Sequence, residues 1–295
     1  MTQSTAVYDL HLHSLWSYDA TASVAAYFKA ARRLGVRCIA ITDHHLADGL
    51  DEVKNTMLDY PEIRAIRAPE ITVETKYGPI DLLCYGVQDP IPPVLEEVFN
   101  LYRWWQREYG AAISEGMRAL GFSFNEEQRL ELLATYRPAR AIAAQGATHV
   151  SNQVLRDHFL AKGFISSPEE YGQLMRQLGE KVGFPPYPSV SEVVPALKKA
   201  GCLIVIAHPY RYFSGYDLTR IDALREICGL DGIECAHPNV PAEYGKRYCE
   251  YCDLHGLVPT GGSDCHDESS IEEYFARHNG PTCWLDKFLN ALDGR

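Results

Sequence analysis

The chain alternates short apolar runs with longer stretches in which apolar residues recur every three or four positions. This alternation is typical of repeated β-α units built around a parallel sheet or barrel. The apolar runs predict strands at residues 7–13, 36–42, 63–68, 80–87, 203–207, 232–235 and 257–260. Helices are expected between them, for example at 22–34 and 190–200, each followed by a glycine that can end a helix. The pattern therefore predicts an α/β fold.

Residues 89–188 interrupt this alternation and are expected to be mostly helical. Apolar spacing predicts helices at 94–120, 126–136 and 152–162. A proline-rich stretch, Pro185-Pro186-Tyr187-Pro188, then predicts a loop before the alternation resumes. We therefore expect residues 1–88 and 189–295 to form the sheet or barrel. Residues 89–188 are predicted to be a helical insertion within the same domain that covers one end of it.

The composition limits the classes of protein to which this chain can belong. With 295 residues, 46% of them hydrophobic and 23% charged, it is long enough for one barrel-sized globular domain. No apolar run approaches the roughly 18 residues that cross a bilayer. Residues 1–6 lack signal-peptide features, so we expect a cytoplasmic protein with no membrane partner. A formal net charge of −11 argues against duplex nucleic acid as a partner, but bound cations can still attract a small phosphorylated substrate.

Two histidines lie in the first predicted strand, where residues alternate between the two faces. Asp9, His11 and His13 are expected to share one face, with Leu10 and Leu12 on the other. Two imidazoles two residues apart at a strand end form a natural clip for a metal ion. A polar strand edge with unrelated histidines would produce the same pattern, so this cluster alone leaves both interpretations open.

Histidines and carboxylates also follow other predicted strands, at the end where α/β barrels place their catalytic groups. These residues are His44, Glu70, His208, Asp264 and His266. Singly, each has an ordinary explanation, such as a salt-bridging surface glutamate, a core histidine or a generic glycine-rich loop. Together they favour one shared site for divalent ions such as Mn²⁺, Fe²⁺ or Zn²⁺, which suit mixed imidazole and carboxylate ligands.

Five motifs, taken in order, resemble those of the PHP (polymerase and histidinol phosphatase) family. They are Asp-Leu-His-Leu-His-Ser at 9–14, Ile-Thr-Asp-His at 41–44, Pro-Glu-Ile at 69–71, Ala-His-Pro at 207–209 and Gly-Ser-Asp-Cys-His at 262–266. The resemblance implies a distorted (β/α)7 barrel, with the helical insertion at its active-site end. It also implies a metal-dependent phosphoesterase with two or three divalent metal ions.

The resemblance further implies a role for each ligand. His11, His13, Glu70 and Asp264 correspond to the ligands of one metal. Asp19 and His44 correspond to those of a second, with Glu70 bridging the two metals. A third is expected at His208 and His266, completed by His149. This sequence departs from the family pattern at Ala20, where a glycine is common, and at Asp81, where many relatives have histidine.

Within the family, the helical insertion resembles the branch that includes 3′,5′-nucleoside bisphosphate phosphatases. His208-Pro209-Tyr210-Arg211-Tyr212 is similar to a His-Pro-Gly-Arg-Tyr motif of that branch. Arg211 is therefore the main candidate for binding phosphate, since guanidinium groups match phosphate oxygens. Arg137 and Arg140 are further candidates. Four aromatic residues of the insertion either stack on a base or pack the insertion together: Tyr102, Trp104, Trp105 and Tyr109.

The implied reaction is attack of a metal-activated hydroxide on phosphorus. His208 or His266 is expected to protonate the leaving oxygen. The expected substrate is a small phosphate ester, namely a nucleotide of the 3′,5′-nucleoside bisphosphate type. Alternatives are a phosphodiesterase acting on a cyclic phosphate or short oligonucleotide, a histidinol-phosphate-type phosphatase, and a metal-stabilised binding module without turnover.

Overall fold

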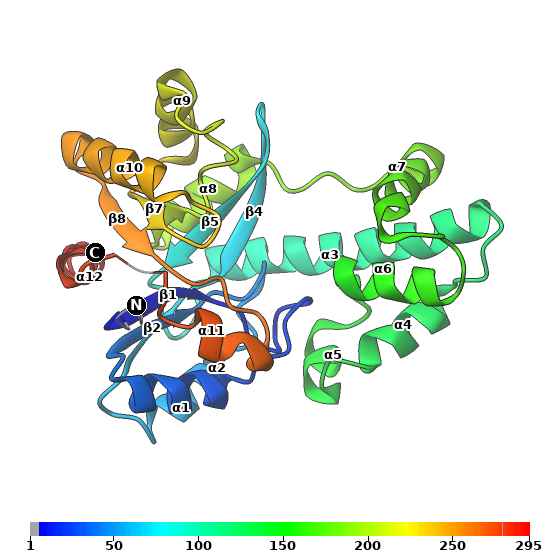
Figure 1. Cartoon of the computed structure of the whole chain (residues 1–295), viewed down its shortest axis with the longest axis horizontal. Coiled ribbons are helices and arrows are strands. Elements are labelled where there is room, and N and C mark those ends of the chain that lie inside the picture. Colours follow the sequence, from blue (N-terminus) through cyan, green and yellow to red (C-terminus); the bar gives the residue numbers. More distant parts are fainter. Residues whose placement is uncertain (1–5, 279) are drawn as a thin grey trace. The chain divides into compact units, whose positions relative to one another are not determined.

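The structure is a computed structural model that describes residues 6–278 and 280–295 (Figure 1). Two compact units are present. The described residues up to Phe99 and from Tyr187 onward form the first unit, and Asn100–Pro186 form the second. Among the described residues, no helix is both long enough and apolar enough to cross a membrane.

The strands of the first unit form two sheets. The first has the order β1 (Tyr8–Leu12), β2 (Cys38–Ile41) and β3 (Arg64–Arg67), and all its pairs are parallel. The second has the order β4 (Glu70–Thr75), β5 (Gly78–Tyr85), β6 (Leu203–Ile206), β7 (Gly232–Ala236) and β8 (Val258–Gly261). In the second sheet β5 is antiparallel to both β4 and β6, and the remaining pairs are parallel.

The predicted α/β class is confirmed, whereas a closed seven-stranded barrel is not. Strand β4 was not predicted, because Glu70 and Glu74 interrupt its apolar character and its pairing comes from a tight hairpin with β5. Two isolated bridges, which pair Leu12 with Cys265 and His44 with Glu70, connect the edge of the first sheet to the second. These bridges lie at the carboxyl ends of β1 and β2, so they bring several of the predicted ligand segments together.

Helices cover the first sheet on one face. Helix α1 (Val24–Leu34) begins at Ser23, whose side chain accepts a hydrogen bond from the Ala26 amide, and ends at Gly35 with a φ of 72°. With α2 (Leu50–Met57) it buries Tyr27, Phe28 and Val53 against Ile39 and Ile41. Figure 1 shows both helices along this face.

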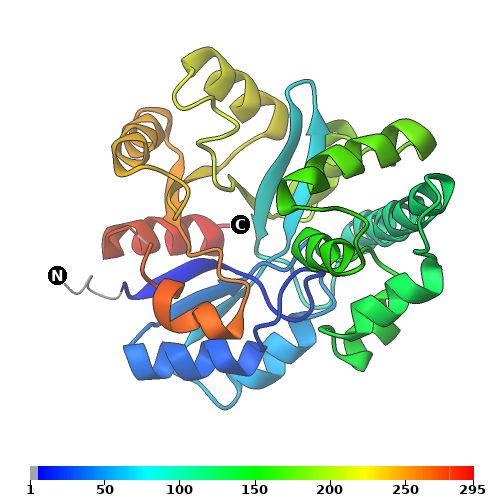
Figure 2. The same ribbon diagram turned by 45° about the vertical axis from the view of Figure 1, so that its right-hand side comes forward.

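A second core cluster lies on the other face of the first sheet. Leu10 and Ala40 pack there with Leu83 and Val205 of the second sheet and with Phe288 of α12 (Thr282–Asp293). Figure 2 shows α12 alongside β1. Leu12 belongs to the cluster beneath α1 instead, so the prediction that Leu10 and Leu12 share a face is wrong. The reason is an irregular register between Asp9 and Leu12 in the pairing of β1 with β2.

The remaining helices of the first unit follow or precede the strands of the second sheet. They are α8 (Val190–Lys199), α9 (Leu218–Cys228), α10 (Ala242–His255) and α11 (Ile271–Tyr274). Each of α9 and α10 lies between consecutive parallel strands, so these segments are the β-α units that the sequence predicts.

The second unit is helical. Its helices are α3 (Pro93–Ala119, which starts in the first unit), α4 (Glu126–Ala134), α5 (Ala139–Gln145), α6 (Asn152–Ala161) and α7 (Tyr171–Val182). Its core joins Ile113 and Met117 of α3 to Leu133, Phe159 and Leu178 of later helices. The buried guanidinium of Arg129 donates to the Ser114 hydroxyl and to the carbonyl oxygens of Ala147 and Thr148.

Asp9 ties three segments of the first unit together. Its buried carboxylate accepts hydrogen bonds from the amides of Ser263 (3.0 Å), Ala276 (2.8 Å) and His11 (3.4 Å). We expect Asp9→Ala to lower the free energy of unfolding by about 2–5 kcal/mol, because buried amides would lose their acceptor. Urea denaturation of this variant, beside the exposed Asp59→Ala control, measures the effect. Equal stability of the two variants would contradict this role for Asp9.

Candidate metal centre

Four predicted ligands converge at the carboxyl ends of β1 and β8. The Nε2 atom of His11 lies 3.1 Å from Nε2 of His13, 3.3 Å from Oε2 of Glu70 and 3.3 Å from Oδ1 of Asp264. The Nε2 atom of His13 lies 3.2 Å from the same two carboxylate oxygens. Four ligand atoms from distant parts of the sequence therefore surround one point, as they would around a metal ion.

A glycine makes this convergence possible. A side-chain carbon added at Gly262 would lie 2.2 Å from Cβ of His11, which is far inside van der Waals contact. The absence of a side chain at Gly262 lets the segment after β8 pass directly against β1. The same passage places the Asp264 amide where it donates to the His11 carbonyl oxygen at 2.9 Å.

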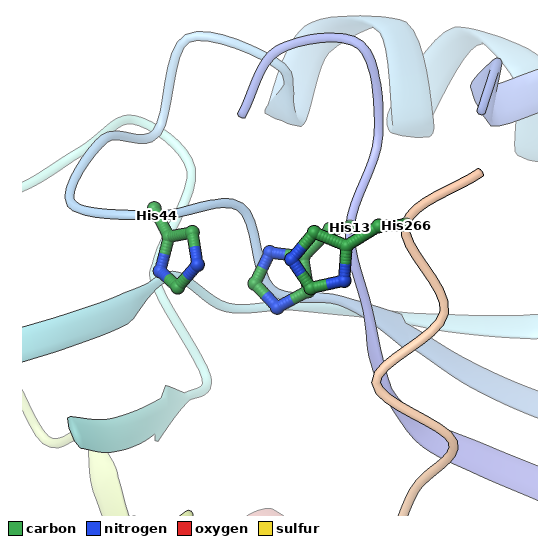
Figure 3. A group of neighbouring side chains, drawn as sticks. All are labelled: His13, His44 and His266. Atoms are coloured by element: carbon green, nitrogen blue, oxygen red, sulfur yellow. The ribbon is translucent and has the colours of Figure 1, made fainter. Parts of the chain in front are cut away.

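A second group lies beside the first. Nε2 of His44 is 3.4 Å from Oδ2 of Asp19, and Nδ1 of His44 is 3.3 Å from Oε2 of Glu70. His266 joins this group, with its Nε2 atom 3.7 Å from Asp19 and its ring stacked on His13 at a centroid separation of 4.1 Å. Figure 3 shows the rings of His13, His44 and His266 gathered from three separate segments.

The other oxygen of Glu70 faces a third group. Oε1 of Glu70 lies 3.2 Å from Nε2 of His208, which is also 3.8 Å from Oδ2 of Asp81. The hydroxyls of Thr72 and Tyr212 donate to the Asp81 carboxylate. His208 and His266, which the resemblance assigned to one metal, thus belong to different groups, and Asp81 lies beside His208.

The remaining predicted site residues belong to other segments of the chain. His149 belongs to the helical unit, where its ring is nearly perpendicular to those of Trp105 and Tyr109, at centroid separations of 5.5 and 5.2 Å. Arg137 is buried in that unit and donates to Gln145 and Thr148, whereas Arg140 is exposed. Arg211 is exposed in the segment that follows β6 of the first unit.

The aromatic residues of the helical unit differ in exposure. Tyr102 and Trp105 are buried, and Trp105 donates from its indole nitrogen to the Pro185 carbonyl oxygen at 3.1 Å. Trp104 is 49% exposed, so its ring is accessible. Packing therefore accounts for Tyr102 and Trp105, while Trp104 is a surface residue.

The electrostatics of the centre are those of acids and imidazoles crowded together in buried positions. Burial alone would lower the pKa of His44, but the carboxylates of Asp19 and Glu70 raise it to about 10. At His208 burial also acts to lower the pKa, but the hydrogen bond and the charge of Glu70 outweigh it and raise the pKa to about 9. Burial would raise the pKa of Glu70, yet His11 and His44 hold it well below its usual range. The carboxylates are therefore ionised and attract positive charge, which divalent cations also supply.

Hydrogen bonds prepare two of the histidines to bind a metal through Nε2. Nδ1 of His11 lies 3.0 Å from Oε1 of Glu234, and Nδ1 of His266 lies 2.8 Å from the Asp264 carbonyl oxygen. Both oxygens are acceptors, so in the neutral form of each ring Nδ1 carries the proton and Nε2 has the lone pair. The donor set and its protonation thus fit divalent cations such as Mn²⁺, Fe²⁺ or Zn²⁺.

Two residues of the centre were missed by the sequence predictions. Glu234 of β7 accepts from Nδ1 of His11 and, at 2.7 Å, from the His208 amide. His237 follows β7 and lies with its Nε2 atom 3.3 Å from Oδ2 of Asp264. A signal for His237 was present, because Ala236-His237-Pro238 repeats the Ala-His-Pro motif that follows β6. Glu234 left no such signal, since one acid in an apolar strand is uninformative alone.

Comparison with known proteins identifies the family. A family model for the PHP domain matches residues 9–153, which include the first three motifs and the ligands His11, His13 and Glu70. The chain belongs to the PHP family. This PHP-family chain is therefore an enzyme of the metal-dependent phosphoesterase class, as the five motifs predicted.

Two curated relatives are similar to the PHP-family chain over most of its length. A 3′,5′-nucleoside bisphosphate phosphatase from Chromobacterium violaceum is 26% identical over 265 residues, or 88% of this chain and 86% of the relative. A phosphoribosyl 1,2-cyclic phosphate 1,2-diphosphodiesterase from Eggerthella lenta is 26% identical over 266 residues, or 88% of this chain and 93% of the relative. Both relatives are named for reactions of phosphate esters.

A solved structure supports the fold. The structure of a candidate metal-dependent phosphoesterase from Bifidobacterium adolescentis superposes with a TM-score of 0.74 at 24% identity, covering 98% of each chain. The PHP-family chain thus shares its α/β fold with that protein.

Proposed function

We propose that this PHP-family enzyme is a phosphatase that hydrolyses a small phosphate ester of the nucleotide type, with 3′,5′-nucleoside bisphosphates as the first substrates to test. The observation that carries the proposal is the meeting of three ligand groups on the single buried carboxylate of Glu70. The Chromobacterium violaceum relative, named a 3′,5′-nucleoside bisphosphate phosphatase, supports this choice of substrate.

We propose that divalent cations bind to the two groups that share Oε2 of Glu70. His11, His13 and Asp264 would complete one site, and Asp19, His44 and His266 would complete the other. Cations held by these residues would lower the pKa of a coordinated water and stabilise charge on phosphoryl oxygens. His208 and Asp81 are candidates for a third site at the other oxygen of Glu70. The role of His149 in a third site stays a prediction.

His208, which lies outside the two sites that share Oε2 of Glu70, is the proposed proton donor to the leaving oxygen, and His266 would take that role if it did not complete the second site. Their side chains are 21% and 25% exposed, whereas those of His11 and His13 are fully buried. Only a partly exposed imidazole can reach a leaving group on a bound substrate. The pKa of His208, raised to about 9 by Glu70 against the effect of burial, keeps its ring protonated near neutral pH before cations bind.

Arg211 is proposed to bind a phosphoryl group of the substrate. It lies three residues after His208, and its side chain is exposed. We expect Arg211→Ala to raise KM about 10–100-fold, the cost of losing one or two charge-assisted hydrogen bonds, with metal content unchanged. Steady-state kinetics of this variant beside Arg33→Ala, an exposed arginine of α1, measure the effect. An unchanged KM would remove Arg211 from the proposed site.

The test of the function is a substrate panel with the Mn²⁺-loaded full chain. Adenosine 3′,5′-bisphosphate, adenosine monophosphates, histidinol phosphate and a linear nitrophenyl diester would be compared by phosphate or alcohol release. We expect the bisphosphate to have the highest kcat/KM and the Asp264→Ala variant to be inactive. No release from any ester by a protein that binds Mn²⁺ would leave a binding module as the better description.

A second candidate function is hydrolysis of a cyclic phosphate diester. It is favoured by the Eggerthella lenta relative, whose name describes a 1,2-cyclic phosphate of a phosphoribosyl compound. Adding a ribose cyclic phosphate to the same panel separates the two proposals. A kcat/KM higher for the cyclic ester than for the bisphosphate would replace the first proposal with the second.

A further inference from the structure

His237 lies at the metal centre but does not match the geometry of a ligand. It follows β7, its side chain is 1% exposed, and its ring lies 5.8 Å from that of His11 and 5.4 Å from that of His208. Together with His11 and Glu234 it forms one of the groups in which ligand atoms are close enough to hold an ion. By proximity alone, His237 would be taken for a further metal ligand.

The hydrogen bond at the other ring nitrogen opposes that role. The backbone amide of Asn239 lies 2.9 Å from Nδ1 of His237. A backbone amide is always a donor, so Nδ1 of His237 must be the acceptor and carry no proton. In the neutral ring the proton is then on Nε2, which has no lone pair for a cation. His11 and His266 have the opposite arrangement, with the proton on Nδ1 and the Nε2 lone pair available.

The two oxygens of Asp264 face different histidines. Oδ1 lies 3.3 Å from Nε2 of His11 and 3.2 Å from Nε2 of His13, where the first cation site is proposed. Oδ2 lies 3.3 Å from Nε2 of His237. An Nε2–H group on His237 can donate to Oδ2 and so leave Oδ1 directed at the cation.

We propose that His237 is a positioning residue, which donates its Nε2 proton to Asp264 and orients that carboxylate, and is not itself a metal ligand. The inference rests on the metal centre of the proposed function. Under this proposal the histidines of the two Ala-His-Pro sequences, which follow β6 and β7, have different roles. His208, after β6, directs its Nε2 atom at Glu70, whereas His237, after β7, directs its Nε2 atom at a carboxylate already facing other ligands.

Two conservative variants distinguish positioning from ligation. In His237→Gln the side-chain amide can reach the place of Nε2 and donate to Asp264. In His237→Asn the shorter amide reaches only the place of Nδ1 and can accept from the Asn239 amide, but the donor to Asp264 is lost. A residue that only fills space would make the two variants alike, so the comparison isolates the hydrogen bond to Asp264.

The measurements are Mn²⁺ stoichiometry at saturation and Mn²⁺ affinity by chelator competition, using the full chain without substrate. We expect the stoichiometry of both variants to equal that of wild type. The affinity should fall about 10–100-fold in His237→Asn and His237→Ala, the usual effect of losing a group that orients a ligand, and less in His237→Gln. His255→Gln, at an exposed histidine of α10, is the matched control.

Three results would overturn the inference. Loss of one bound Mn²⁺ in both His237→Gln and His237→Asn would make His237 a ligand. Equal affinities of all variants and wild type, or equal losses in Gln and Asn variants, would exclude the hydrogen bond as the cause. Thermal unfolding of the metal-free variants shows whether each is folded, and the Gln and Asn comparison is made between folded proteins. If wild type itself bound no Mn²⁺, the proposed metal centre would fail, which is a separate outcome.

Discussion

Glu70→Gln is expected to reduce kcat/KM by about 1,000-fold or more at saturating Mn²⁺. The carboxylate of Glu70 is buried, and its two oxygens face His11, His13, His44 and His208 at 3.2–3.3 Å. Glutamine has nearly the same shape but no charge to balance the cations. Its amide group would also direct hydrogens at whichever ligands face the nitrogen. Both kcat/KM and the number of bound Mn²⁺ ions are the quantities to measure.

Glu74→Gln is the matched control for this variant. Glu74 lies on the same strand, β4, four residues later. Its side chain does not belong to any group of ligand atoms among the described residues. We expect Glu74→Gln to retain wild-type activity and metal content. The assignment of Glu70 would be wrong if the two variants lost activity equally.

Loading the metal-free protein with Mn²⁺ is expected to release protons. Asp19 and Glu70 outweigh burial and raise the pKa of His44 to about 10, and Glu70 likewise raises that of His208 to about 9. Both rings are thus protonated near pH 7.5, and the second proposed site, which His44 would help to complete, can bind a cation only after the His44 proton leaves. The affinity for Mn²⁺ should therefore rise as the pH increases from 7 to 9, by about tenfold per pH unit for each displaced proton. Titration calorimetry in buffers of different ionisation enthalpy counts the protons released.

The same histidines predict how the stability of the metal-free protein depends on pH. Their folded-state pKa values lie above the unfolded value of about 6.5, so protonation stabilises the folded state. This contribution is complete below about pH 6.5 and is lost as the pH rises through about 9 and 10. We expect the Tm of the chelated protein to fall between pH 7 and pH 9 relative to that of the Mn²⁺-loaded protein. A constant difference in Tm over that range would contradict the coupling.

Parts of the fold could be predicted because their patterns are local. Strands β2 and β6 consist of four apolar residues each, Cys-Ile-Ala-Ile and Leu-Ile-Val-Ile, and both are followed by a histidine of the centre. Strand β4 could not be predicted, because its acids are needed at the centre and its partner is supplied by the hairpin with β5. The separation of Leu10 from Leu12 was also invisible, since it depends on a register irregularity between β1 and β2.

The residue types at the strand ends, the order of the five motifs and hence the family can be recognised without any coordinates. The tertiary structure alone decided which atoms face one another. It placed His266 beside Asp19, placed His208 beside Asp81, and brought Glu234 to His11 across 223 positions of the chain. The physical reason is that a strand's own residues fix only the direction of each side chain, whereas the proton on each ring nitrogen is fixed by a partner from a distant strand.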